Sequence, residues 1–337
     1  MCQDDEALLR VASKGALMER SILGIDVGKR DFHCALLEAD KKPHANNFPN
    51  SSVGFTRLLT WLRNRHVAHV HACLEATGGW SEELAGFLHE HGHVVSIVNA
   101  AAVKAFGSSE LSRTKTDKAD AALIARYCAA LQPQPWRPPS AAVRRLQRLV
   151  RRRVALDEMR VQELNRLEAP GSTDVRTSIE QTIAFFSKQI EAIDQEIDDL
   201  IGSDPTLKHK KDLLESIPGI GERTSTTLLG EIPNISEFRN GKALAAFVGL
   251  CPQERRSGTS VSASWLSKAG NSQVRRVLYW PAISASVHNP ILKAFAARLK
   301  TRGKRPKQII AAVMRRLLVQ AYGVLKSQTR FDPAYAT

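Results

Sequence analysis

The stretch "SILGIDVG", residues 21–28, decides the fold of the first part of the chain. Its β-branched residues and closing glycine are typical of a short strand. Further runs of this kind, "HCALLEA", "HVHACLEA" and "HVVSIVN", alternate with helical patterns over residues 54–65 and 81–91. Alternating strands and helices predict an α/β sheet domain, which we place at residues 21–132.

A proline-rich segment ends this region. The stretch "LQPQPWRPPS", residues 131–140, contains four prolines and predicts a domain boundary. Beyond it the chain is predicted to be helical almost to its end. An arginine-rich helix over residues 141–168 is followed, after a Pro-Gly break, by a helix whose apolar residues alternate in spacing between four and three. This spacing is the seam of a coiled coil, formed here by Ile179, Ile183, Phe186, Ile190, Ile193, Ile197 and Leu200.

The two long helices form a predicted coiled-coil segment over residues 140–204, and the sequence leaves open whether they pair within one chain or form a dimer seam. After them, "IPGIG" at residues 217–221 links two apolar-periodic helices in the form of a helix-hairpin-helix. Gly219 and Gly221 would let backbone amides face a phosphate, although a purely structural turn is the alternative. The helical C-terminal domain, residues 205–333, continues with a glycine- and serine-rich loop between helices, within residues 252–276.

The charge of the chain indicates its partner. It has 48 Lys and Arg against 34 Asp and Glu, a formal net charge of +14. Such an excess most often serves nucleic acid. The predicted nucleic-acid contacts are Arg113, Lys115, Lys118, Gly219, Gly221, Arg255, Arg256, Lys268, Arg275, Arg276, Lys304 and Arg305.

The same reading predicts where the protein works. No apolar run approaches the roughly 20 residues of a membrane span, and residues 1–20, an N-terminal extension, do not resemble a signal peptide. We therefore expect a cytoplasmic, nucleoid-associated protein with no membrane partner. The five cysteines are scattered without a Cys-x-x-Cys pair, which favours neither disulfides nor a thiolate zinc site.

Four acids are the candidate metal ligands. Asp26 and Glu75 each end a predicted strand, and Asp117 and Asp120, three residues apart, share one face of a predicted helix near its start. Gathered together, they would repel one another unless a divalent cation or protonation intervened. Because all the ligands are hard oxygens, the predicted cofactor is Mg²⁺. A histidine metal site built from residues 69–75 and 89–93 is the less favoured alternative, since turns accumulate histidine without any ligand role.

The ordered motifs carry a family resemblance. Asp26 in "GIDVGK", Glu75 in "LEATG", the pair in "RTKTDKADA", then "IPGIG" and "GLCPQERRSGTS", resemble the DEDD-type insertion-sequence transposases, described as bridge-RNA-guided recombinases. The resemblance runs over residues 21–333. It implies an RNase H-like (RuvC-like) N-terminal domain whose four acids are catalytic and bind Mg²⁺, and a C-terminal transposase domain with a nucleophilic serine. By match to the pattern Gly-Leu-x-Pro...Ser-Gly, that serine is Ser257.

The resemblance also implies a noncoding bridge RNA that pairs with donor and target DNA, and a homo-oligomer, a dimer or a tetramer. The expected activity is excision and insertion of a mobile element. A serine that attacks phosphorus conserves the phosphodiester energy in a covalent link, so strands are resealed without ATP. The acids and Ser257 lie in different predicted domains, which makes the expected site composite.

Rival interpretations use the same residues differently. A RuvC-like junction nuclease would direct water instead of Ser257 at the phosphate. An actin-like ATPase would use "GIDVG" as a phosphate loop, although the basic charge opposes it. A non-enzymatic nucleic-acid-binding scaffold would leave the acids inert. Tyr279, close to Arg275 and Arg276, hints at a tyrosine recombinase, but this helical spacing favours packing and phosphate contact.

Overall fold

The computed structural model describes residues 21–38, 43–76, 79–110, 116–169, 172–255, 263–267 and 269–334, with the backbone alone for residues 254, 255, 263 and 264. The chain divides into two compact units, Met1–Pro138 and Pro139–Thr337, and the division lies in the proline-rich segment. The first unit contains a mixed sheet with helices, and the second is mostly helical. This confirms the predicted order of an α/β region followed by a helical region.

The sheet of the first unit has the strand order β3-β2-β1-β4-β5. Its strands are β1 Ser21–Val27, β2 Asp31–Leu37, β3 His44–Pro49, β4 Val70–Glu75 and β5 Val94–Val98. The first three strands pair antiparallel, whereas β4 is parallel to both β1 and β5. Parallel neighbours need a crossover connection. The helices α2, Ser52–Arg63, and α3, Gly79–Glu90, precede β4 and β5 and supply it.

The two faces of the sheet bury different helices. Leu23 and Ile25 of β1 belong to a core that includes Phe55 of α2 and Leu84 of α3. On the opposite face, Cys73 of β4 packs with residues of two further helices, α4, Ala100–Ser109, and α5, Asp117–Leu131. Because side chains alternate along a strand, every second residue of β1 and β4 faces α5.

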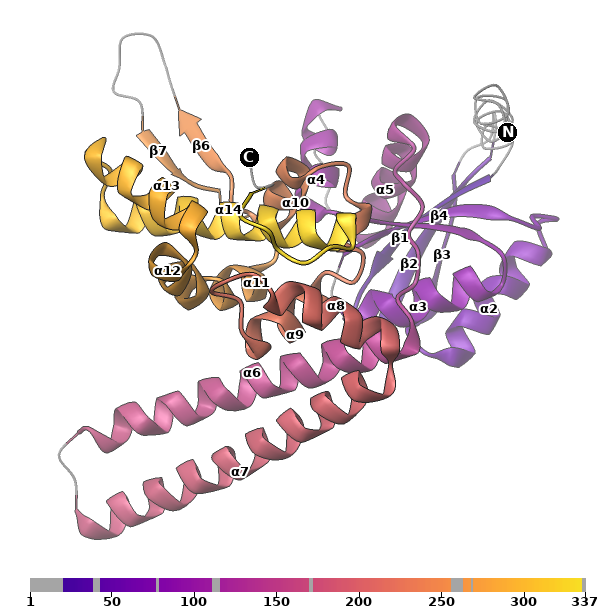
Figure 1. Ribbon diagram of the computed structural model, residues 1–337. Coiled ribbons are helices and arrows are strands. Elements are labelled where there is room, and N and C mark those ends of the chain that lie inside the picture. Colours follow the sequence, from indigo (N-terminus) through magenta and orange to yellow (C-terminus); the bar gives the residue numbers. More distant parts are fainter. Residues whose placement is uncertain are drawn as a thin grey trace. The chain divides into compact units, whose positions relative to one another are not determined.

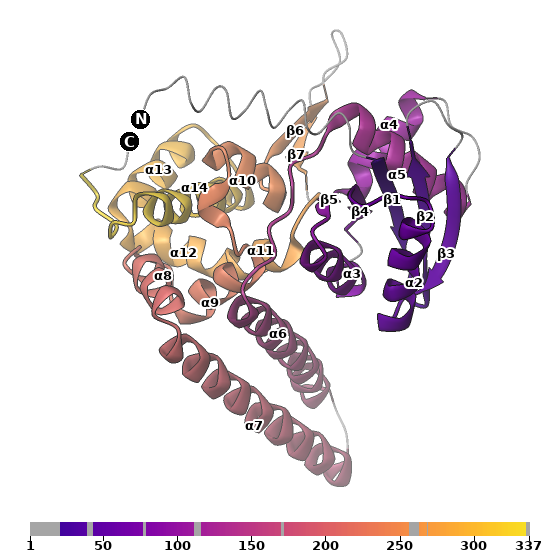
Figure 2. The ribbon, with the colours of Figure 1, turned by 90° about the vertical axis from the view of Figure 1, so that its right-hand side faces the viewer.

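Helix α5 packs directly against β1 of the sheet (Figure 2). A Cβ atom at Gly24 would lie 2.2 Å from the carbonyl oxygen of Ala121 and 2.3 Å from the amide nitrogen of Ala125. Ala35 of β2, beside Gly24, is buried under the same helix. Any side chain at Gly24 would therefore push α5 off the sheet, and with it the acids at the start of α5.

Two elements of this unit were not predicted, namely β3 and α4. β3 is an edge strand with the sequence "HANNFP", and most of its residues are exposed. Its polar composition gives no apolar alternation, which is the signal that sequence reading depends on. The helices α2 and α3 begin two residues before the predicted starts.

A long helical hairpin opens the second unit. Helices α6, Ala141–Leu167, and α7, Thr173–Ser203, pack side by side (Figure 1). All seven predicted seam residues of α7 are partly or fully buried, with Ile190 and Ile197 the most buried. The two helices therefore pair within one chain. A coiled-coil seam between chains stays a prediction.

A buried arginine connects this hairpin to the rest of the unit by an ion pair and hydrogen bonds. The guanidinium of Arg153, on α6, lies 3.0 Å from Asp194 of α7 and also donates to Thr226 and Thr227 of helix α9, Glu222–Glu231. Arg153 is 4% exposed. A buried guanidinium is costly unless it is paired and hydrogen-bonded, so these contacts fix the root of the hairpin.

Helix α14, Pro306–Ser327, packs against most of the remaining helices. These remaining helices are α8 Pro205–Glu215, the short 3₁₀ helix η1 Ile235–Glu237, α10 Gly241–Val248, α11 Ser272–Val277, α12 Tyr279–His288 and α13 Pro290–Thr301. By length and composition α14 could cross a membrane. However, Val313, Leu317 and Leu318 are buried in the protein core, so the burial accounts for the apolar character of this helix.

One part of the second unit corrects the sequence prediction. The segment predicted as a loop between helices contains an antiparallel hairpin of two strands, β6 Pro252–Arg255 and β7 Ala263–Leu266. The register pairs Gln253 with Trp265, and the Trp265 indole donates to the Gln253 side chain at 3.1 Å. Strands of four residues are too short to show a clear alternation of apolar and polar residues, which explains why the sequence did not reveal them.

Candidate functional site

The sheet places two acids at neighbouring strand ends. Gly24 faces α5, and Asp26, two residues further along β1, lies on the same face. Gly24 is the register partner of Cys73 on β4, and Glu75 is two residues beyond Cys73. Asp26 and Glu75 therefore end adjacent parallel strands on the α5 side of the sheet.

Helix α5 brings the other two acids to the same point. Thr116 caps its N-terminus, because the threonine hydroxyl oxygen accepts the amide of Ala119 at 3.2 Å. Ala121 touches Gly24, so the preceding turn, with Asp117 and Asp120, lies near Asp26. One carboxylate oxygen from each of the three aspartates lies within 4.8 Å of the others.

The pKa of Asp26 reflects this crowding. Burial, followed by the charges of Asp120, Asp117 and Glu75, raises it to about 6, while His33 acts in the opposite direction. Burial and the charge of Asp120 also raise the pKa of Glu75. Glu75 thus belongs to the same electrostatic group as the three aspartates, and Asp120 acts on both of the strand-end acids.

The donor set fits a hard divalent cation. Carboxylate oxygens from two strand ends and one helix are the ligands that Mg²⁺ and similar ions prefer. Mutual repulsion opposes ionisation of Asp26, and a bound cation would relieve it. Within the part of the chain that the structure describes, the ligand atoms of Asp26, Asp117 and Asp120 lie close enough together to share one ion.

Sequence reading missed His33. Its Nδ1 atom lies 3.8 Å from a carboxylate oxygen of Asp117, and it is the cross-strand partner of Asp26 in the β1-β2 pairing. Residues directly opposite each other in an antiparallel pair share one face of the sheet. The signal that could have revealed His33 is the short connection at residues 28–30. A tight β-hairpin at this point pairs His33 with Asp26.

The raised pKa of Asp26 can be detected from the pH dependence of the free energy of unfolding. The carboxyl has a folded pKa of about 6 against 3.8 ordinarily, so the folded state holds its proton more tightly than the unfolded chain does. Asp26 therefore contributes stability at low pH that is lost as the pH rises through this interval. In Asp26→Asn, we expect a smaller decline in the free energy of unfolding than in the wild type, measured by urea titration in EDTA.

The matched control is Glu90→Gln, at the exposed end of α3. This variant should keep the wild-type decline. Parallel pH profiles for the wild type and Asp26→Asn would show that Asp26 ionises freely, and would contradict the crowding of acids described above.

Several predicted contacts lie outside the described residues. They are Arg113, Lys115, Arg256, Ser257 and Lys268. Arg255 is described by its backbone alone, at the end of β6. Lys118 is exposed on the first turn of α5, between the two helix-borne aspartates.

The two glycines of the α8-α9 turn have different surroundings. Gly219 has a φ of 104°, and a Cβ atom there would lie 2.6 Å from the Cβ of Ala285 on α12. This close packing gives Gly219 a structural role. Gly221 is exposed at the N-terminus of α9 with open space around its Cβ position. The geometry leaves Gly221 the better placed of the two for a phosphate.

The remaining predicted cations also differ in their contacts. Arg275 donates to the carbonyl of Val248 at 2.7 Å, which ties it to the end of α10. Arg276 forms an ion pair with Glu158 of α6. Lys304 lines a cavity beside α14, and Arg305 immediately precedes that helix, its amide donating to the Gln308 side chain at 3.1 Å.

The histidines of the alternative metal site have protein partners. His71 Nε2 and Ser96 Oγ are 2.8 Å apart, and His91 Nδ1 lies 2.8 Å from the carbonyl of Phe87. Cys73 and Cys128 are buried without a disulfide. These contacts give His71 and His91 a structural explanation within the sheet unit.

Comparison with known proteins supplies the family. Residues 23–170 match a DEDD-type IS110 family described as "Transposase", and residues 211–297 match "Transposase IS116/IS110/IS902 family". The "Pilin gene-inverting protein" of Moraxella bovis is 35% identical over 94% of this chain and 98% of its own length. The "Transposase for insertion sequence element IS1328" of Yersinia enterocolitica is 23% identical, over 77% of this chain and 81% of the relative.

A solved structure of Thermus thermophilus RuvC matches 34% of this chain and 99% of its own, at 16% identity and a TM-score of 0.27, which is too low to establish a shared fold. The family matches and the full-length relative settle the classification. They agree with the resemblance carried by the ordered motifs. A DEDD-type transposase family suggests a divalent metal, and the group of Asp26, Asp117 and Asp120 is a candidate site for it. The chain belongs to the IS110/IS116 family of transposases.

Proposed function

We propose that the protein excises and inserts an insertion-sequence element by Mg²⁺-dependent, serine-mediated strand exchange guided by a bridge RNA. The observation that carries the proposal is the convergence of three aspartates, with Glu75 electrostatically coupled to them. Acids from separate elements gather at one edge of the sheet although they repel one another. A bound cation would offset this repulsion, which gives the arrangement a physical reason.

In this proposal Asp26, Glu75, Asp117 and Asp120 hold the cation through their carboxylate oxygens. Bound Mg²⁺ would stabilise negative charge on the scissile phosphate and help to deprotonate the attacking hydroxyl. The close approach of α5 to Gly24 positions the helix-borne acids over the strand ends. The RuvC-like character of the sheet unit is part of the proposal, supported by its mixed α/β architecture.

Ser257 is the proposed nucleophile. Its Oγ atom would attack phosphorus, forming a phosphoserine ester while the bond from phosphorus to the leaving sugar oxygen breaks, and that oxygen takes up a proton. Attack by a hydroxyl of another strand would reverse the step and release the serine. The support is the match of Gly249, Leu250, Pro252, Ser257 and Gly258 to the family pattern.

The name of one group of relatives favours strand exchange over hydrolysis of the phosphodiester. The Moraxella proteins are called pilin gene-inverting proteins. Inverting a gene requires that cut strands be rejoined, which a covalent enzyme-DNA link provides and simple hydrolysis does not. This supports a recombinase in preference to the junction nuclease that activates water.

Exchange between donor and target DNA involves several strands, which suits a dimer or tetramer. Apolar side chains are exposed towards the end of the α6-α7 hairpin, among them Val161, Leu164, Val175 and Phe185. Exposed apolar residues grouped in this way are typical of surfaces that pair with another molecule. They support self-association through the hairpin, which is one of the two alternatives that the seam pattern leaves open.

Guidance by RNA is tested by purifying the protein from its host and sequencing any RNA that remains bound. We expect a discrete noncoding RNA encoded at the ends of the element, and loss of excision after RNase treatment. A basic chain binds RNA nonspecifically as well, so the control is a purification in high salt, which weakens nonspecific phosphate contacts. Recombination that persists without RNA would refute guidance and leave the metal and serine chemistry to be tested separately.

A further inference from the structure

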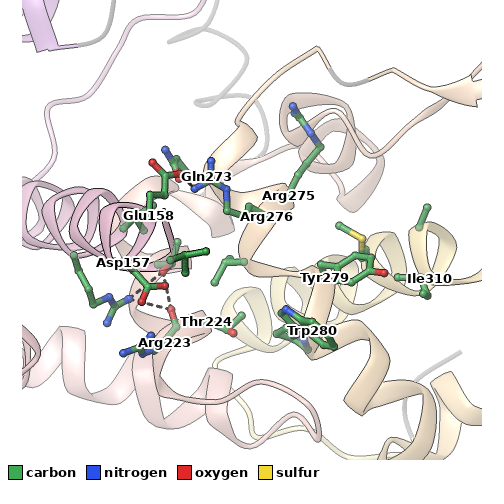
Figure 3. Close-up of a pocket in the computed structure, with 18 of the residues that line it drawn as sticks. Asp157, Glu158, Arg223, Thr224, Gln273, Arg275, Arg276, Tyr279, Trp280 and Ile310 are labelled. Atoms are coloured by element: carbon green, nitrogen blue, oxygen red, sulfur yellow. Dashed lines mark hydrogen bonds and ion pairs between the residues drawn. The ribbon is translucent and has the colours of Figure 1, made fainter. Parts of the chain in front are cut away.

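A large cavity lies within the helical unit, among the residues that the structure describes. It measures about 1210 Å³ and is lined by α6, α9, β7, α11, α12 and α14 (Figure 3). Neither the acids nor the α8-α9 turn contributes to its wall. Its volume exceeds the usual 300–1,000 Å³ of a small-molecule pocket, which points to a larger occupant.

Aromatic rings at this cavity face solvent. Trp280 is 73% exposed and Tyr279 is 39% exposed, and their ring centroids lie 5.6 Å apart. A tryptophan is among the most buried side chains on average, so one this exposed needs an explanation. Figure 3 shows both rings projecting from α12 at the same cavity.

The charged side chains that line the cavity are mostly positive. Arg223, Arg275, Arg276 and Lys307 contribute to the lining. The two acids of the lining already have arginine partners: Asp157 is 2.6 Å from Arg160, and Glu158 pairs with Arg276. Lys307 is exposed, and no described carboxylate lies within ion-pair distance of it.

A second cavity adjoins the first beside α14. It measures about 260 Å³, and Leu266 and Ala311 line both cavities. Here too an exposed ring accompanies cations: Trp265 is 47% exposed, and Lys304 and Arg315 line the same wall. Trp265 lies on β7, the strand that follows the segment containing Ser257.

We propose that the two adjoining cavities bind an unpaired segment of nucleic acid. Its bases would stack on Trp280, Tyr279 and Trp265, and its phosphates would contact Lys307, Lys304 and Arg315. Aromatic rings interleaved with cations are the arrangement by which proteins hold single strands, since every base has a π-face. Bases inside a duplex are already stacked and cannot occupy such rings, which is why the ligand is unpaired.

The test measures binding of labelled oligonucleotides of about 12 nucleotides to the full chain by fluorescence anisotropy. Single-stranded RNA, single-stranded DNA and the matching duplex are compared in EDTA, so a failure of the metal chemistry would not affect the result. In Trp280→Ala, we expect affinity for the single strands to fall about tenfold, because stacking of one base is lost. Trp280→Phe should retain most of the affinity, and duplex binding should change little.

The matched control is Phe247→Ala on α10, which removes an exposed ring of the same unit that lies outside both cavities. It should leave single-strand affinity unchanged. A stronger effect on RNA identifies a guide-type RNA as the occupant, and a stronger effect on DNA identifies a displaced strand; both support the site. If Trp280→Ala is poorly folded by circular dichroism, Trp265→Ala is used with the same expectation.

Three results would overturn the proposal. Unchanged single-strand affinity in both tryptophan variants would show that the rings do not stack on bases. An equal loss for duplex and single strands would indicate a general phosphate-binding face. A change in oligomeric state by light scattering, at unchanged affinity, would show that a second copy of the chain covers these rings.

Discussion

Replacing Asp120 with asparagine is expected to lower Mg²⁺-dependent strand cleavage by about a thousandfold, a barrier increase of ~4 kcal/mol. Asp120 shares the close carboxylate group with Asp26 and Asp117, and its charge raises the pKa of both Asp26 and Glu75. Asparagine keeps the shape but removes the charge and one hard ligand oxygen. The measurement is cleavage of a labelled substrate at saturating Mg²⁺.

A second readout separates loss of the site from loss of the fold. Without the charge of Asp120, the pKa values of Asp26 and Glu75 should move back towards their ordinary range, which NMR titration of the carboxyl groups can follow. Glu90→Gln, which removes an exposed acid of the same unit, should cleave like the wild type. Full cleavage by Asp120→Asn, or by Asp117→Asn, would instead favour the non-enzymatic scaffold in which the acids are inert.

Replacing Ser257 with alanine should abolish the covalent protein-DNA adduct altogether, because no other group would provide the oxygen that joins the protein to phosphorus. A suicide substrate with a nick near the cleavage point traps the adduct, which is then seen as a protein band of reduced mobility in a denaturing gel. The wild type should form this band only when Mg²⁺ is present.

Two serines of the same stretch provide controls. Ser260→Ala and Ser262→Ala keep the composition of the segment and remove one hydroxyl each. Both should still form the adduct. An adduct that survives in Ser257→Ala would refute the assignment of the nucleophile, and hydrolytic cleavage without any adduct in the wild type would favour the nuclease that activates water.

The acidic group shows which features of the site can be predicted from nearby residues in the sequence and which cannot. Strand alternation and helical periodicity place Asp26 and Glu75 at strand ends and Asp117 and Asp120 on one helix face, because each depends only on nearby residues. Their proximity could be expected only from the ordered motifs. The actual cause lies in long-range packing: Gly24 admits α5 against β1, and the β1-β4 register aligns the two strand ends.

The sequence by itself determined the α/β region followed by helices, the positive charge, the candidate acids and the family resemblance. These follow from composition, short-range periodicity and the order of motifs, all of which are written along the chain. Only the tertiary structure decided that His33 faces Asp26, that burial raises the pKa of Asp26, and that Trp280 and Trp265 border adjoining cavities. Each of these depends on contacts between residues far apart in the chain, and solvent exposure and local dielectric exist only once those residues have packed.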